Sequence, residues 1–161
     1  MSVPQQLARH LSDAYFGGNW TWVNMKDTLS DVTWQEATTR VYDCNTIAVL
    51  VYHINYYTAV QIKVLQGSPL DAHDKYSFDC PPVNSQQDWE KMLAEVLDNA
   101  TVLATLVKQL PAEKAWEYFT DEKYGTYYRN IQGNTEHIHY HLGQVVILKK
   151  VIRGQNNVSS H

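Results

Sequence analysis

Residues 126–153, TYYRNIQGNTEHIHYHLGQVVILKKVIR, carry the pattern from which the fold class follows most directly. The apolar and small polar residues among them recur at steps of three and four, which is the spacing of one face of a long helix. The residues that share this face are Ile131, Asn134, Ile138, His141, Val145, Leu148 and Ile152. Such a continuous face predicts a helix that packs along neighbouring helices, with Gly154 as its expected stop.

Three further long helices are predicted upstream of this one. They span about residues 4–16, 45–65 and 85–110. Pro4 suits a first helical turn, Asn45 is the expected cap of the second helix, and Ser85 with Asp88 resembles a capping box. Because no segment shows sustained strand alternation, the sequence predicts an all-α fold, a four-helix bundle.

Two long connections and two short helical pieces separate these four helices. After Gly17-Gly18 a short helical piece is expected from about Asn19, and residues 30–44 show little periodicity. The segment 111–119 predicts a turn of helix before the fourth long helix. Residues 67–84 form a loop of unusual length for a small domain, and loops of this length are often functional.

Length and composition exclude several classes of protein. A chain of 161 residues with 44% apolar and 19% charged residues fits one globular domain, expected to span residues 1–161. The net charge of −4 gives no basic surface, so no nucleic acid partner is expected. No run of about 18 apolar residues and no signal-peptide pattern is present, so we expect a cytoplasmic protein without membrane contact.

The cysteines and glycines of the sequence argue against disulfide bonds and nucleotide binding. Cys44 and Cys80 are the only cysteines and form no CxxC pair, so free, partly buried thiols are expected. No glycine-rich phosphate loop is present, and seven glycines in total argue against a dinucleotide-binding fold. Neither covalent cross-links nor nucleotide binding is therefore predicted.

The histidines at 137, 139 and 141 are the clearest chemical feature. His137 and His141 are four residues apart, so a helix stacks them on one face about 6 Å apart. Two imidazoles at that separation can reach one ion with metal–nitrogen bonds of about 2.1 Å. His139 points about 160° away and is expected to be a surface or packing residue. Ile138 stands where an HExxH zinc protease needs glutamate, which disfavours that class.

A third histidine, His53, lies among apolar residues on a different predicted helix. Helix bundles build metal sites from inward side chains on facing helices. Buried imidazoles need polar partners, and those partners can be hydrogen-bonding groups as well as an ion. Spacing alone therefore leaves two interpretations open: His53, His137 and His141 hold one divalent metal, or they are core histidines satisfied by hydrogen bonds.

Two segments resemble a known family. Val51-Tyr52-His53-Ile54 and the block 137–145, HIHYHLGQV, are similar to the DinB/YfiT-like superfamily of metalloenzymes, and helix order and length agree over essentially the whole chain. The resemblance implies a DinB-like four-helix bundle, a long connection after the first helix, and a homodimer. It also implies one zinc or nickel ion bound by His53, His137 and His141, with positions left open for water or substrate.

The resemblance implies a metal-dependent enzyme that acts on a small molecule, either a hydrolase or a thiol-dependent transferase that uses a low-molecular-weight thiol. The reacting group would be metal-bound water or thiol. The alternative is a non-catalytic, stress-related binding module whose metal is structural or acts as a sensor. Chain position suggests four residues for the mouth of the site: Tyr124, Tyr127, Tyr128 and Arg129. Glu36, Asn45 and Asp98 are candidates to orient the ligating histidines.

Overall fold

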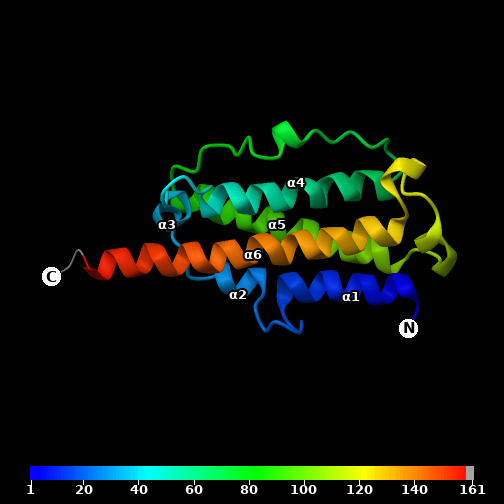
Figure 1. Ribbon diagram of the computed structural model, residues 1–161, viewed down its shortest axis with the longest axis horizontal. Helices are drawn as coiled ribbons and strands as arrows, with labels where there is room; N and C mark the ends of the chain where they lie inside the picture. The colour runs from blue at the N-terminus through cyan, green and yellow to red at the C-terminus, as the bar shows by residue number, and fades with distance from the viewer. Residues whose placement is uncertain (159–161) are drawn as a thin grey trace.

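A computed structural model describes residues 1–158, and over that range the chain is all-α, as predicted (Figure 1). Its four long helices are α1 (Val3–Phe16), α4 (Ile47–Leu65), α5 (Gln86–Lys108) and α6 (Tyr127–Val158). The short helices are α2 (Met25–Leu29) and α3 (Trp34–Thr38), with 3-10 turns η1 (Asp74–Tyr76), η2 (Ala112–Trp116) and η3 (Glu122–Tyr124). The described residues contain no β-strand, and Tyr118 and Thr126 form an isolated bridge.

The four long helices lie side by side. α1 and α4 each pack against both α5 and α6 (Figure 1). The predicted face of α6 is buried in this packing: Ile131, Ile138 and Val145 are fully enclosed, and the polar Asn134 and His141 are buried among them. The apolar periodicity of α6 therefore determines which side chains enter the core, and it carries two polar groups inward.

The start of α4 differs from the prediction by one residue. Asn45 is exposed, and the helix begins after Thr46, whose backbone is extended and whose hydroxyl accepts a hydrogen bond from the Val49 amide at 3.3 Å. Either residue type can cap a helix, so the sequence could not choose between neighbours. Ser85 caps α5 as predicted, by accepting from the Asp88 amide.

We expect Thr46→Ala to lower the free energy of unfolding by about 1 kcal/mol, because one amide at the start of α4 loses its acceptor. Asn45→Ala is the matched control and should change stability by less than about 0.5 kcal/mol, since Asn45 is exposed and caps nothing. Urea denaturation followed by circular dichroism measures both. Equal losses in the two variants would show that the cap has been assigned to the wrong residue.

The connection between α1 and α4 contains more helix than expected. The first short helix begins at Met25 rather than near Asn19, because the Asn24 side chain caps the amide of Asp27. Residues 30–44, predicted to be irregular, contain α3, which starts with a capping box between Thr33 and Glu36. A five-residue helix is too short to show periodicity in a sequence.

Contacts with the long helices hold this connection in place. The indole Nε1 of fully buried Trp89 on α5 donates to the Val32 carbonyl at 2.8 Å. Arg153 on α6 pairs with Asp31 at 2.8 Å and with Glu36 at 2.7 Å. Side chains far away in the sequence therefore stabilise α3, which explains why its own pattern did not reveal it.

Gly154 does not end α6. The helix continues through it to Val158, and Gly154 is not among the glycines with a positive φ. A glycine stops a helix when its backbone turns left-handed, and here it keeps the helical conformation. The cysteines also differ in part from the prediction: both are free, but Cys44 is exposed and only Cys80 is partly buried.

The connection between α4 and α5 runs back along the outer side of α4, with η1 near its middle (Figure 1). Hydrogen bonds join it to α4: the Tyr56 hydroxyl accepts from the His73 amide at 2.8 Å, and the Tyr57 hydroxyl donates to Asp74 at 2.6 Å. The predicted long loop is thus present, and it covers the same helix that carries His53.

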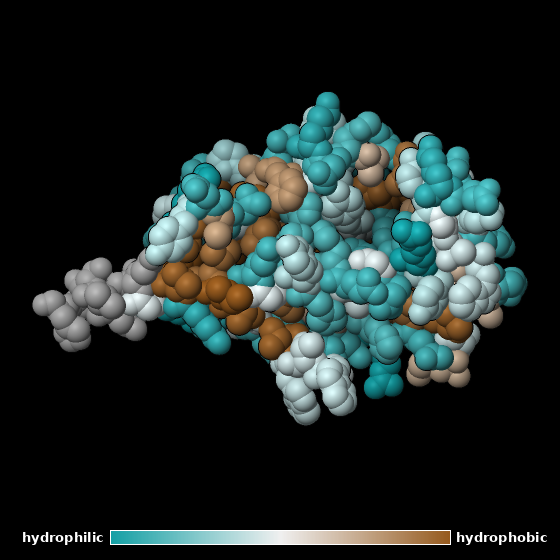
Figure 2. Space-filling view, viewed as in Figure 1, coloured by the Kyte–Doolittle hydropathy of each residue, from teal (hydrophilic) through white to brown (hydrophobic). Residues whose placement is uncertain are grey.

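The surface has two distinct regions over α6. Figure 2 shows apolar residues gathered over the C-terminal half of α6, whereas its N-terminal half lies beneath a mostly hydrophilic surface. Ile147 contributes to the exposed apolar area. Among the described residues, no helix combines the length and the apolar character that a membrane crossing requires.

Candidate metal centre

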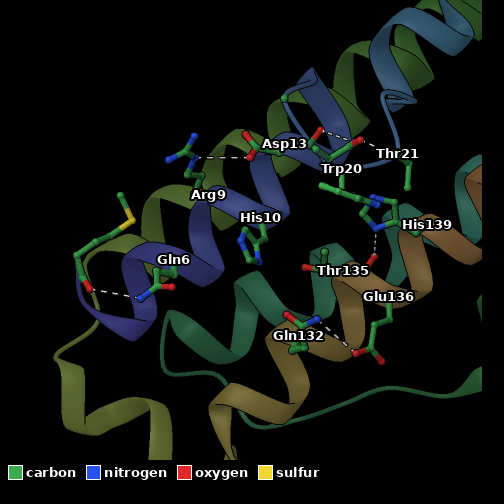
Figure 3. A pocket seen from close by; sticks show the side chains of 13 residues that line it. Gln6, Arg9, His10, Asp13, Trp20, Thr21, Gln132, Thr135, Glu136 and His139 are labelled. Atoms are coloured by element: carbon green, nitrogen blue, oxygen red, sulfur yellow. Dashed lines mark hydrogen bonds and ion pairs between the residues drawn. The ribbon is translucent and has the colours of Figure 1, made fainter.

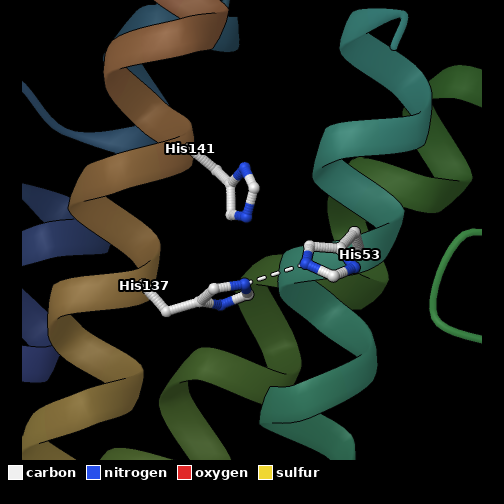
Figure 4. Close-up of side chains that lie close together, drawn as sticks. All are labelled: His53, His137 and His141. Carbon is white, nitrogen blue, oxygen red and sulfur yellow. Dashed lines mark hydrogen bonds between the residues drawn. The ribbon is translucent and has the colours of Figure 1, made fainter. Parts of the chain in front are cut away.

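Three imidazoles from two helices converge on one point. His53 projects from α4 toward α6, and His137 and His141 project from successive turns of α6 toward α4 (Figure 4). One ring nitrogen from each histidine lies within 4.8 Å of the others, and the Nε2 atoms of His53 and His137 are 2.9 Å apart. His53 and His141 are buried and His137 is partly buried. The arrangement could hold a metal ion, as the spacing of these residues suggested.

Hydrogen bonds to Nδ1 of His53 and of His141 leave Nε2 of each ring free to face the other histidines. The Ser77 hydroxyl donates to the Asp74 carbonyl at 2.7 Å, so it accepts the Nδ1–H of His53 at 2.9 Å. The Gln144 side-chain oxygen accepts the Nδ1–H of His141 at 2.7 Å. Both rings therefore direct an Nε2 lone pair at the common point, and such partners orient metal-ligating histidines in proteins.

The third ring shows unused hydrogen-bonding capacity. His137 Nδ1 is buried without a hydrogen-bond partner in the described part of the chain, and so is Asn134 Oδ1, one turn earlier on α6. Buried polar atoms without partners are uncommon and costly, by about 1–3 kcal/mol each. Because these two atoms lie on the part of α6 that carries the histidines, stable packing alone does not explain the residues found there.

The donor set fits a divalent transition metal. Two nitrogens that bind one tetrahedral ion with bonds of about 2.1 Å are separated by about 3.3–3.4 Å. The 2.9 Å between His53 and His137 is slightly shorter, and the 4.8 Å limit for the whole group is longer. Small rotations of the rings reach the required spacing. Neutral imidazole nitrogens suit zinc and nickel better than magnesium or calcium.

The environment of His137 and His53 favours their neutral form, because the pKa of each ring is lowered. Burial, together with the neighbouring His141 and His53 rings, lowers the pKa of His137 to about 4. Burial also lowers the pKa of His53, with the His141 ring adding to the effect. An imidazole must be deprotonated at the nitrogen that binds a metal, so near pH 7 protons compete weakly for these two positions.

Aromatic rings enclose the histidines. Phe78 stacks on His53 with ring centroids 4.0 Å apart, and Tyr57 meets the edges of His53 and His137 at 5.3 and 5.2 Å. Burial raises the pKa of Tyr57 to about 12, and its bond to Asp74 acts in the same direction. The Tyr57 hydroxyl is therefore a hydrogen-bond donor near neutral pH.

A cavity of about 620 Å³ opens onto the three histidines. Its other lining residues are Tyr57, Gln61, Asp74, Phe78, Arg129, Asn130, Gly133, Asn134 and Tyr140. The volume lies within the range of about 300–1,000 Å³ typical of small-molecule sites. The site is thus open on one side to a small molecule and closed by helices on the other.

The residues predicted for the mouth of the site separate into two groups. Arg129 lines the cavity. Tyr127 is buried against Phe119, exposed Tyr128 stacks on Trp116, and Tyr124 is exposed on η3; these three tyrosines are not among the residues that line it.

The side chains that orient the histidines are not the ones expected. Glu36 pairs with Arg153, Asn45 is exposed, and Asp98 is exposed on α5, whereas Ser77 and Gln144 bind the ligand rings. Gln144 stands one turn after His141, a spacing that could have signalled the bond. Ser77 lies in a loop whose path no periodicity describes, so only its unusual length pointed to function.

His139 lies apart from this centre, as expected. Its Nδ1–H donates to the Thr135 carbonyl at 2.9 Å, and its ring faces a second cavity of about 650 Å³ between α1, α6 and the segment 18–21 (Figure 3). Arg9, Asp13 and the exposed Trp20 line this second cavity. No group of three or more potential metal ligands other than His53, His137 and His141 occurs among the described residues.

Three imidazole nitrogens are one donor fewer than the four protein ligands of a closed structural zinc site. A tetrahedral ion held by them would have one position left for a further ligand, and the cavity adjoins these three residues. Comparison with known protein families, with curated proteins and with solved structures gives no match for this chain.

Proposed function

We propose that this protein is a DinB-like four-helix bundle that binds one divalent transition metal, zinc or nickel, through Nε2 of His53, His137 and His141. The convergence of three imidazoles from α4 and α6 carries this proposal. The hydrogen bonds from Ser77 and Gln144 support it, because they orient the Nε2 lone pairs of two rings toward the third. The family resemblance of the sequence agrees with the same three residues.

We further propose that the protein is an enzyme acting on a small molecule, as a metal-dependent hydrolase or a thiol-dependent transferase. An ion bound here supplies Lewis acidity at neutral pH. Tyr57, whose hydroxyl donates to Asp74, and Phe78, which stacks on His53, line the cavity beside the position of this ion. The cavity beside the histidines favours this function over a purely structural metal. The homodimer and the thiol co-substrate stay predictions from the resemblance.

Turnover assays on the metal-loaded and the chelated protein test the catalytic proposal. One panel contains activated esters and amides, and a second pairs low-molecular-weight thiols with electrophilic substrates. We expect activity in one panel, lost on chelation and restored by zinc or nickel. Full metal occupancy without turnover, together with a large drop in melting temperature on chelation, would instead favour the non-catalytic alternative.

A further inference from the structure

Residues on one face of α6 line the cavity along its length. Arg129, Gly133, His137 and His141 follow one another at steps of four residues, and all four line the same cavity. Residues four apart lie on the same face of a helix. His137 is eight positions after Arg129, which corresponds to about 12 Å along the helix axis. The cavity therefore has a histidine end and an arginine end.

Arg129 brings an exposed positive charge to the cavity lining, and no acidic side chain among residues 1–154 forms a salt bridge with it. Its guanidinium forms no salt bridge and no side-chain hydrogen bond with the side chains described, those of residues 1–154. Its stem passes close to Gly125: a Cβ added there would lie 2.7 Å from Arg129 Cδ, so this glycine, at φ 76°, leaves the room that the stem occupies. The side chain of Arg129 is exposed, and it lines one end of the cavity.

The opposite end carries the opposite charge. Asp74 is the other charged residue of the lining, and it accepts a hydrogen bond from Tyr57, which contacts His53 and His137. An anionic group is therefore repelled by Asp74 and attracted by Arg129, which orients any elongated ligand. The aromatic rings of Tyr57, Phe78 and Tyr140 provide an apolar surface near the histidines.

The space beside Gly133, between the arginine end and the histidine end of the cavity, is free of protein atoms. A Cβ added at Gly133 would meet no atom within 4 Å, although this glycine lies in the middle of α6. Glycine in a helix interior costs about 1 kcal/mol relative to alanine. Its position between Arg129 and His137 keeps free the space that a longer side chain would fill.

We propose that this cavity binds an elongated organic carboxylate, with its carboxylate on Arg129 and its apolar or reacting end against the three histidines. The part that concerns the reacting end rests on the proposed metal site. A guanidinium matches a carboxylate with two parallel hydrogen bonds, and it discriminates against an uncharged group of the same shape. The inference therefore names both the substrate class and its direction in the site.

Calorimetric titration with 6-phenylhexanoate and with its uncharged amide tests this inference on the zinc-loaded and the zinc-free protein. We expect the carboxylate to bind about 10- to 100-fold more tightly than the amide. Arg129→Gln should remove that preference, and Gly133→Leu should abolish binding of both ligands while favouring the helix. Arg9→Gln is the matched control, because it removes an exposed arginine that lines the second cavity instead.

Equal affinity for carboxylate and amide, an unchanged preference in Arg129→Gln, or no saturable binding of the carboxylate would each overturn the inference. Zinc content measured on the same samples separates it from the proposed function. Retained zinc without a carboxylate preference contradicts only the inference. Arg129-dependent carboxylate binding by a protein that takes up no zinc contradicts only the metal site and leaves the anion-binding end supported.

Discussion

His141→Ala should lose most of its bound metal and stay helical. The substitution removes one of three converging nitrogens, and loss of a direct ligand costs more than the 10- to 100-fold typical of an outer partner, so we expect a drop of about 100-fold or more in zinc affinity. The fold should persist because His141 is one of only two buried polar side chains, with Asn134, on the face of α6 described above, and its apolar residues remain. Equilibrium dialysis with elemental analysis gives the affinity, and circular dichroism gives the helix content.

His139→Ala is the control for that experiment. It removes an imidazole from the same helix, two residues away, whose ring faces the second cavity. It should bind zinc as tightly as the wild-type protein. Undiminished metal in His141→Ala, or equal losses in both variants, would show that the three rings do not share an ion, and the proposed function would fail with them.

Trp89→Ala should destabilise the protein by about 3–5 kcal/mol. Trp89 is the largest of the fully buried side chains, and its removal leaves a cavity between α5 and the α1–α4 connection. It also leaves the Val32 carbonyl without the indole donor. Urea denaturation measures the change, and the m-value reports whether the connection detaches before the long helices unfold.

Trp20→Ala is the matched control, since Trp20 is 96% exposed and should contribute less than about 0.5 kcal/mol. A loss below about 1 kcal/mol in Trp89→Ala would contradict the packing described for α5. The comparison makes the same substitution at a fully buried and at an exposed position, so the difference between the two losses reports mainly the burial of Trp89.

The long helices could be predicted because their signals are local and repeated. The face of α6 from Ile131 to Ile152 places an apolar or small polar residue inward at almost every turn, and the structure buries the same residues. Short elements gave no such signal: α3 is stabilised by Arg153 and Trp89, which lie more than fifty residues away in the chain. Caps shifted by one residue, as at Thr46, because neighbouring residues have similar capping ability.

In the candidate site, too, the residues on helices could be predicted from the sequence and the residues on a loop could not. The histidines could be predicted from helical spacing and from a third ring on another helix, and Arg129 from its place at the start of α6. Ser77, Phe78 and Asp74 could not, because they reach the site from a loop whose path depends on contacts with Tyr56 and Tyr57. Sequence patterns describe the faces of helices, whereas the meeting of a loop with a helix depends on tertiary structure.

The α4–α5 connection has an evolutionary consequence. It contributes Asp74, Ser77 and Phe78 to the surroundings of the histidines, whereas the four long helices supply most of the buried core. Mutations in this loop can therefore alter which molecules are accepted while the helical scaffold and its three imidazoles stay constant. Divergence among descendants of this protein should accumulate in that loop first, and new specificities could arise there at little risk to folding.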